Sequence, residues 1–134
     1  MKIALAQINT TVGDFAGNVA RLREACQRAA ELGAELVLAP ELAITGYPPR
    51  DLLLKSGFIE GNLAALAELA ADIGDTALVV GHVSLNADQP GRPATNAVSI
   101  LHRGKAVATR AKSLLPTYDA VSYTHLTLPT ICSV

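Results

Sequence analysis

The chain has 134 residues, half of them hydrophobic, and a formal net charge of -1 from 11 basic and 12 acidic side chains. This length and apolar content are typical of one folded domain with its own core, not of a disordered segment. No block of like charge occurs, which argues against nucleic-acid or anionic-membrane partners. The sequence has no bilayer-spanning apolar stretch, no signal-peptide pattern and only two distant cysteines, so we expect a reducing, cytoplasmic location.

The chain begins with a pattern that predicts a strand and then a helix. Residues 2–8 are an apolar run without alternation, which is typical of a strand covered on both faces. Apolar residues then recur at helical spacing over residues 19–30. Asp14 or Asn18 is the candidate N-cap of this helix, and Gly33 is its expected stop.

A second strand, a loop and a second helix follow. The apolar run at residues 36–39 predicts a buried strand, and the proline-rich segment 40–53 predicts a stiff loop. An apolar stripe from Ile59 to Ile73 predicts the second helix, which Gly74 would end.

Three more strands are expected after the second helix. Residues 77–83 form an apolar strand, residues 86–93 a polar loop, and residues 96–102 and 105–110 a hairpin that turns at Arg103-Gly104. The order of elements predicts an α/β fold with a mixed sheet and helices packed on one face. Because the strands lack a polar face, the other face of the sheet must also be covered.

Glu41 is the first candidate site residue, because it follows the second strand where the loop begins. In open α/β folds this edge of the sheet is where ligands bind. Pro40, Pro48 and Pro49 stiffen the loop, and Gly46 permits a turn. A carboxyl group held beside apolar walls is suited to act as a general base. The alternative is a solvated Glu41 on an ordinary turn.

Lys112 is the second candidate, since it follows the last strand directly and an ammonium group there can stabilise an oxyanion. The alternative is a surface lysine whose stem covers apolar neighbours. Cys26 lies on the apolar stripe of the first helix, so we interpret it as a core residue. His82, His102 and His125 have no metal-ligand spacing and are interpreted as structural or exposed.

Two tyrosines, Tyr47 and Tyr118, each lie close in sequence to a candidate site residue. A tyrosine offers apolar area and one hydroxyl group, so either residue is suited to line a pocket or simply to pack. The glycines form neither a dinucleotide-binding nor a P-loop motif.

Three stretches of the sequence resemble the nitrilase (carbon–nitrogen hydrolase) superfamily. They are residues 1–18, the segment Pro40–Leu53 with Gly46-Tyr47-Pro48-Pro49, and Lys112 with Leu115-Pro116-Thr117-Tyr118. The second stretch resembles, more closely, the N-terminal glutamine amidotransferase domain of glutamine-dependent NAD synthetases. The resemblance runs from residue 1 to about Asp119 and covers about the first half of such a domain.

The resemblance implies a four-layer α-β-β-α sandwich, of which this chain holds only the N-terminal half. It also implies a Glu–Lys–Cys triad that hydrolyses glutamine through a thioester. Glu41 would be the general base and Lys112 would stabilise the tetrahedral intermediate. Tyr118 would contact bound glutamine, and Tyr47 would help to shape the pocket.

The partners and cofactors are also implied only by the resemblance. The ammonia would pass to a synthetase domain of the same parent chain, which uses ATP and Mg²⁺ to amidate deamido-NAD. The amidotransferase domain itself would need no cofactor and no metal, and the parent protein would be a homo-oligomer. Nucleic acid and membrane are not expected as partners.

The end of the sequence departs from the family pattern. The family nucleophile lies well after the lysine in a segment resembling Ile-Cys-Glu-Asp, and Cys132 matches it in two letters only and comes too early. Residues 120–134 contain no charged Asp, Glu, Lys or Arg, so we expect a partial domain over residues 1–119 and a non-native tail after it.

This departure leads to expectations about activity and about folding. The chain would lack the nucleophile and be inactive alone, and, because its sheet is uncovered, it would be marginally folded or prone to aggregate. The alternatives to a synthetase fragment are another amidase of the superfamily and a catalytically inactive piece.

Overall fold

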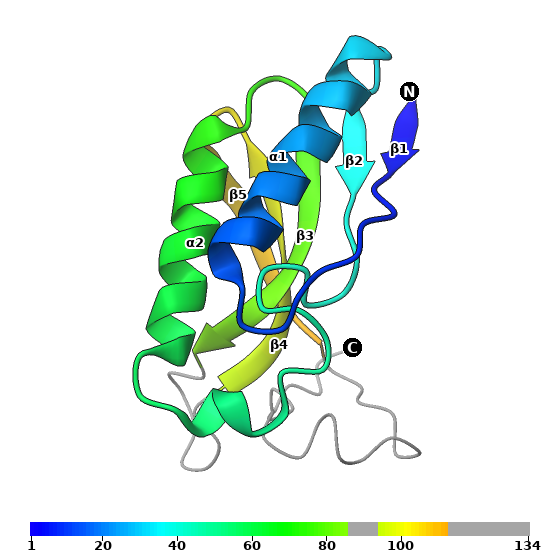
Figure 1. Cartoon of the computed structure of the whole chain (residues 1–134). Coiled ribbons are helices and arrows are strands. Elements are labelled where there is room, and N and C mark those ends of the chain that lie inside the picture. Colours follow the sequence, from blue (N-terminus) through cyan, green and yellow to red (C-terminus); the bar gives the residue numbers. More distant parts are fainter. Residues whose placement is uncertain (86–93, 113–134) are drawn as a thin grey trace.

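The computed structural model describes residues 1–85 and 94–112, which form a mixed five-stranded sheet with two α-helices on one face (Figure 1). In chain order the elements are β1 (Ile3–Leu5), α1 (Phe15–Glu31), β2 (Leu36–Leu38), the 3-10 helix η1 (Arg50–Leu54), α2 (Phe58–Asp72), β3 (Ala77–Leu85), β4 (Ala94–His102) and β5 (Lys105–Ala111). The strands lie in sequence order, with β1, β2 and β3 parallel and β4 and β5 antiparallel to their neighbours. The predicted mixed sheet with helices on one face is confirmed.

Helix α1 begins and ends at local signals in the sequence. The Asp14 side chain caps its N-terminus by accepting a hydrogen bond from the Gly17 N–H at 2.9 Å. The helix ends before Gly33, whose φ of +75° is a conformation that other residues rarely adopt. Asn18, the other candidate cap, is fully buried and instead holds two loops together.

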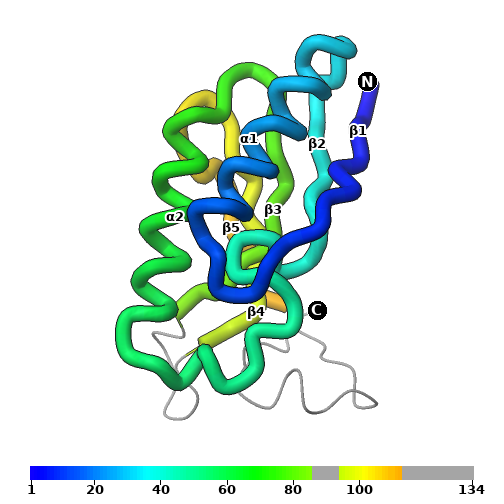
Figure 2. Tube along the Cα trace, in the orientation of Figure 1, coloured from blue at the N-terminus to red at the C-terminus, as the bar shows by residue number. Residues whose placement is uncertain are grey.

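The main core lies between the helices and the sheet. Both helices cross the same side of the sheet in Figure 2. The buried residues of this layer come mainly from α1, α2, β2, β3 and β4. They include Val19, Leu22, Cys26, Val37, Leu66, Leu69, Leu78, Val80 and Leu101. Cys26 is 8% exposed among these side chains, so its interpretation as a core residue is confirmed.

The first strand is shorter than the sequence pattern predicts. Strand β1 ends at Leu5 because its partner β2 ends at Leu38, and the last ladder bond is from the Ala6 N–H to the Leu38 carbonyl. The chain then turns, with the Gln7 N–H bonded to the Leu5 carbonyl. A strand continues only while a neighbour accepts its hydrogen bonds, and a periodicity argument does not contain that limit.

The predicted β4–β5 hairpin is present and turns where expected. Arg103 and Gly104 both have positive φ, at 47° and 81°, as a two-residue type I′ turn requires.

The end of the loop expected over residues 40–53 forms a 3-10 helix, η1, that was not predicted. The polar loop expected at residues 86–93 lies outside the described residues.

The sheet face opposite the helices carries an apolar row that crosses four strands. Leu5, Leu38, Val79 and Ile100 are in register with one another. Leu5 is 68% and Ile100 38% exposed, whereas the neighbouring row at Ala4 faces the core. Residues 1–85 and 94–112 therefore form two layers, one of helices and one of strands. These are one half of the expected four-layer arrangement.

Candidate active site

Glu41 lies in the segment that follows β2 and runs alongside β3. The Ala39 N–H donates to the Val79 carbonyl at 2.9 Å, and the Ile44 N–H donates to the Gly81 carbonyl at 3.3 Å. The segment between these two bonds contains Glu41. The carboxylate therefore lies at the carboxyl end of β2, as the sequence predicts.

Two glycines allow this segment to lie so close to its neighbours. A Cβ atom on Gly81 would overlap the backbone nitrogen of Leu42 and lie 3.0 Å from the Cα of Glu41. A Cβ atom on Gly46 would lie 2.7 Å from the backbone nitrogen of Val12. Contacts this short leave no room for a side chain, so the backbone that presents Glu41 requires glycine at both positions.

A buried asparagine ties the same loop to the start of α1. The Asn18 side chain donates to the Thr11 carbonyl at 2.8 Å and to the Ile44 carbonyl at 3.0 Å. Its Oδ1 accepts from the Thr11 N–H at 2.8 Å. These bonds give backbone groups of both loops hydrogen-bond partners, and they fix the loop that contains Glu41.

Lys112 meets Glu41 at the end of β5. Its backbone N–H donates to the Asn96 carbonyl at 2.8 Å, which continues the β4–β5 pairing by one residue. Its Nζ donates to Oε1 of Glu41 at 2.7 Å. The structure thus brings together the two charged candidates that the sequence singled out.

The third member of this cluster, Asn96, was not singled out from the sequence. Its Nδ2 donates to the same Oε1 of Glu41 at 2.6 Å. A signal for it existed, because an amide in an apolar strand must find a polar partner when it is buried. Sequence patterns do not identify that partner.

The cluster lies at a boundary between solvent and protein. The side chains of Glu41 and Lys112 are 41% and 36% exposed, whereas Asn96 is 4% exposed. A half-solvated ion pair contributes little to stability. Its geometry therefore matters more for what the pair can do to a bound molecule than for holding the fold together.

Glu41 and Lys112 share one hollow, with a volume of about 340 Å³. Its lining comes from the β2 exit, β3, β4 and the end of β5. The lining residues are Ala39, Pro40, Glu41, Gly81, Asn96, Ala97, Val98, Arg110, Ala111 and Lys112. Tyr47 is 39% exposed and is not among them, and Tyr118 lies outside the described residues.

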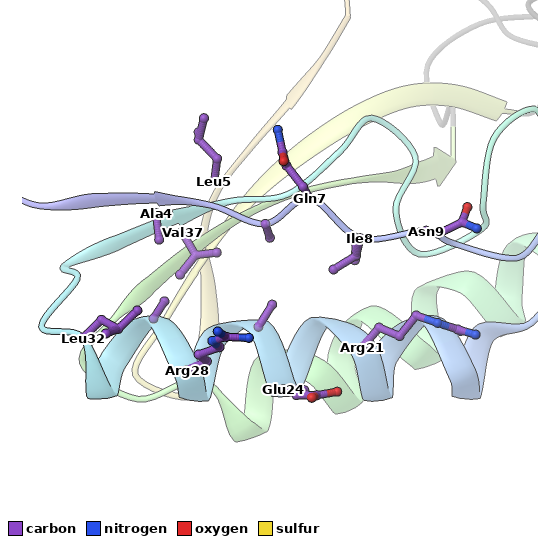
Figure 3. Close-up of a pocket in the computed structure, with 13 residues that line it drawn as sticks. Ala4, Leu5, Gln7, Ile8, Asn9, Arg21, Glu24, Arg28, Leu32 and Val37 are labelled. Carbon is purple, nitrogen blue, oxygen red and sulfur yellow. The ribbon is translucent and has the colours of Figure 1, made fainter.

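A larger hollow, of about 500 Å³, lies between β1 and α1 (Figure 3). Its apolar floor includes Ala4 and Val37, and Arg21, Glu24 and Arg28 lie along its helix side. It contains neither Glu41 nor Lys112. It runs along β1, the strand at one end of the sheet. Its lining does not combine a carboxylate with a lysine ammonium group and a cysteine thiol.

The described cysteine does not serve as the nucleophile. Among residues 1–85 and 94–112 the only cysteine is Cys26, which is buried in the core. Burial raises the pKa of its thiol to about 11, so the reactive thiolate is disfavoured. Cys132 lies outside the described residues.

The histidine nearest this region has a structural role, as the sequence suggested. His82 is 1% exposed, and its Nδ1 lies 3.0 Å from the Val83 carbonyl, which can only accept a hydrogen bond. Nδ1 therefore carries the proton, and Nε2 of the neutral ring accepts from the Ser99 hydroxyl at 2.8 Å. Burial lowers the pKa of His82, which favours this neutral form. His125 lies outside the described residues.

Within residues 1–85 and 94–112, no group of three or more His, Cys, Asp or Glu side chains is arranged to hold a metal ion. None of the helices in those residues is long and apolar enough to cross a membrane.

The sequence matches the carbon–nitrogen hydrolase family over residues 2–130. It is 40% identical over 121 residues to the glutamine-dependent NAD(+) synthetase of a Synechocystis species, covering 87% of this chain and 22% of that protein. It is 41% identical over 119 residues to the enzyme of the same name from Xanthomonas campestris pv. campestris, covering 88% of this chain and 21% of that protein. The chain thus spans about a fifth of the length of the curated relatives it matches.

Solved structures of two kinds share the fold. The glutamine-dependent NAD+ synthetase from Acinetobacter baumannii, in complex with ADP, superposes with a TM-score of 0.85 at 27% identity, over 96% of this chain and 24% of that one. An amidase from a Nesterenkonia species superposes with a TM-score of 0.79 at 26% identity, over 98% of this chain and 49% of that one. A variant of the Nesterenkonia amidase carries the acetamide moiety of fluoroacetamide covalently at its active-site cysteine.

The expected fold class is confirmed, because these neighbours have the nitrilase-type α/β fold and the described sheet with its helices is part of it. The family match spans nearly the whole sequence, and the two curated relatives named above are 40% and 41% identical to it over the aligned residues. The chain belongs to the carbon–nitrogen hydrolase family.

Proposed function

We propose that this chain is part of a glutamine-dependent NAD synthetase and carries two residues of its glutamine-hydrolysing centre. The single observation that supports this most is the 2.7 Å contact between Lys112 Nζ and Glu41 Oε1 at the wall of a shared hollow. A carboxylate and an ammonium group at the mouth of a cavity are the base and the cation that amide hydrolysis through a covalent intermediate requires. The likeness to synthetases supports glutamine as the substrate.

In the proposed reaction Glu41 takes the proton from a cysteine thiol, and the thiolate attacks the side-chain amide carbon of glutamine. Lys112 stabilises the negative oxygen that forms on that carbon. When the C–N bond breaks, Glu41 returns the proton to the leaving nitrogen, which departs as ammonia. Water then hydrolyses the thioester to glutamate with Glu41 as base, and the thiol is regenerated.

The nucleophile in this proposal comes from outside the described residues. Cys26 is excluded by burial, and we do not assign the role to Cys132. The covalent adduct at the active-site cysteine of the Nesterenkonia amidase supports cysteine chemistry on this fold. Tyr118 is proposed to contact glutamine and Tyr47 to shape the outer part of the site, beyond the residues that line the hollow.

The rest of the proposed enzyme would consume the ammonia. A separate synthetase domain of the same parent chain would use ATP and Mg²⁺ to amidate deamido-NAD, and no cofactor would act in the domain described here. The parent would be a cytoplasmic homo-oligomer. None of these proposals requires a further residue of this chain.

A chimera tests the function. Residues 1–112 replace the matching segment of the Synechocystis synthetase, and NAD formation is measured with glutamine and, separately, with ammonia. We expect both activities in the chimera. Glu41→Gln and Lys112→Met should each lower only the glutamine-dependent rate, by at least about a hundredfold, which is the scale of removing one acid–base or oxyanion-stabilising group.

The ammonia-dependent rate is the internal control, because it reports on the synthetase domain alone. A chimera whose glutamine-dependent rate is unchanged by Glu41→Gln would contradict the proposed role of that residue. Glutamate release by the unmodified chain of 134 residues, abolished by Cys132→Ala, would contradict the proposal that the nucleophile lies elsewhere.

A second candidate function is hydrolysis of another small amide. The likeness to the Nesterenkonia amidase over 98% of this chain favours it. A chimera that releases ammonia from acetamide or butyramide faster than from glutamine would favour this alternative.

A further inference from the structure

Asn96 occupies the centre of the cluster that contains Glu41 and Lys112. It lies on β4 between β3 and β5, is 4% exposed, and lines the hollow. Its side chain donates to Glu41 at 2.6 Å, and its backbone carbonyl accepts the Lys112 N–H at 2.8 Å. One buried residue thus contacts both charged groups, which are 71 positions apart in the sequence.

The chemistry of the contact requires an amide donor. A carboxylate oxygen can only accept, so the group that faces Glu41 Oε1 must be the NH₂ of Asn96. The hydrogen bond is charge-assisted, and such bonds are roughly twice as strong as bonds between neutral groups. An amide also adds no charge, so it holds the carboxylate without competing with Lys112 for the role of cation.

The two donors converge on the same oxygen from different elements. Lys112 Nζ and Asn96 Nδ2 lie 2.7 and 2.6 Å from Glu41 Oε1. The Lys112 side chain has several rotatable bonds, whereas Asn96 is buried in a paired strand. The rigid donor therefore sets the direction of the carboxylate, and the flexible one follows it.

We propose that Asn96 is a positioning residue for the general base: it aligns the Glu41 carboxylate through Nδ2 and anchors Lys112 through its carbonyl. The proposal rests on the function proposed above, which makes Glu41 the base.

The test uses the unmodified chain and NMR titration of the Glu41 side-chain carboxyl carbon. We expect the Asn96 side-chain amide resonances to shift with the same pH midpoint as Glu41, and to lose this shift in Glu41→Gln. Asn96→Leu, which removes the donor at similar size, should move the Glu41 midpoint to higher pH by about one unit, because a bond to the charged form has been lost.

Asn62 provides a matched control. It is a fully buried asparagine on α2 whose amide bonds to the backbone of Val83 on the neighbouring strand. Asn62→Leu should destabilise the fold and leave the Glu41 midpoint unchanged. Replacing an asparagine that only supports the fold lowers stability alone. Replacing one that positions Glu41 also moves the titration midpoint of Glu41.

Each outcome supports or overturns the proposal. Asn96 amide resonances that do not follow Glu41 overturn it in the wild-type chain, so the test survives even if Asn96→Leu fails to fold. An unchanged Glu41 midpoint in a folded Asn96→Leu also overturns it. If the chimera described above never uses glutamine while Asn96 still follows Glu41, the proposed function fails and the hydrogen-bond coupling stands. In an active chimera, Asn96→Leu should lower kcat by about tenfold with little change in KM, and Asn96→Asp should not restore it.

Discussion

At the residue scale, the reactive side chains of this chain differ in their access to solvent. Glu41 and Lys112 are paired with each other at the edge of solvent, where a ligand can reach them. A cysteine and a histidine can also act in catalysis, but Cys26 and His82 are both buried inside the protein. Burial disfavours their charged forms, and this difference of environment is visible only once the chain is folded.

The burial of His82 predicts a pH dependence of stability. Its pKa is lowered in the folded state, so below about pH 6.5 the unfolded chain binds a proton that the folded chain does not. The free energy of unfolding should therefore fall as the pH is lowered from about 7 to 5. Urea titrations of His82→Gln should show a flatter dependence over this range. His102→Gln, at the partly exposed end of β4, controls for the loss of a histidine outside the buried layer.

The raised pKa of Cys26 predicts that its thiol is unreactive. Because the pKa of Cys26 is about 11, the fraction of its thiol that is ionised at about pH 8 is about a hundredfold lower than for an exposed cysteine. Alkylation of the native chain, followed by peptide mapping to separate Cys26 from Cys132, should label Cys26 at least about a hundredfold more slowly than in denaturant. Rapid native labelling of Cys26 would mean that the core opens readily.

At the element scale, the approach of the β2–η1 segment to β3 decides where Glu41 lies. The approach depends on Gly81, since any Cβ atom there would meet the backbone of Leu42 and Glu41. It also depends on Asn18, which bonds the loop to the start of α1. The candidate site is thus built by the packing of backbone on backbone before any catalytic side chain is considered.

We expect Gly81→Ala to destabilise the chain by about 1–3 kcal/mol, the usual cost of an overpacked core position. It should also displace Glu41 from Lys112. Urea denaturation measures the first effect, and loss of NMR contacts between the two side chains measures the second. Gly74→Ala is the control, because no atom lies within 4 Å of its added Cβ and its effect should be within about 1 kcal/mol. Equal stability of both variants would show that the loop can move aside.

At the scale of the whole molecule, one face of the sheet is covered by helices and the other carries the apolar row Leu5, Leu38, Val79 and Ile100. The family resemblance implies that a second sheet covers that face. Exposed apolar area of this kind drives association.

We predict that the chain of 134 residues associates at micromolar concentrations and that Ile100→Thr weakens the association. Threonine keeps strand propensity and removes apolar area from the row. Leu54→Thr is the control, because Leu54 is 64% exposed on η1, away from the row. Sedimentation velocity measures the result. A monomeric wild-type chain, or equal effects of both substitutions, would contradict the prediction.

Much of the fold was predictable because its signals are local. The cap at Asp14, the stop at Gly33 and the turn at Arg103-Gly104 each act through the residues beside them. The early end of β1 and the helix η1 were not predicted, because each depends on what neighbouring segments leave free to bond. The family resemblance implied roles for Glu41 and Lys112, whereas no sequence signal connected Asn96 to either.

The sequence by itself determined the order of elements, the exit of a carboxylate from a strand and the family, because periodicity, caps and motifs are written in adjacent residues. Only the tertiary structure decided which buried amide meets Glu41, since Asn96 lies 55 positions away and is placed by the strand register. The physical reason is that a hydrogen bond depends on distance in space, and the pairing of β3, β4 and β5 sets that distance.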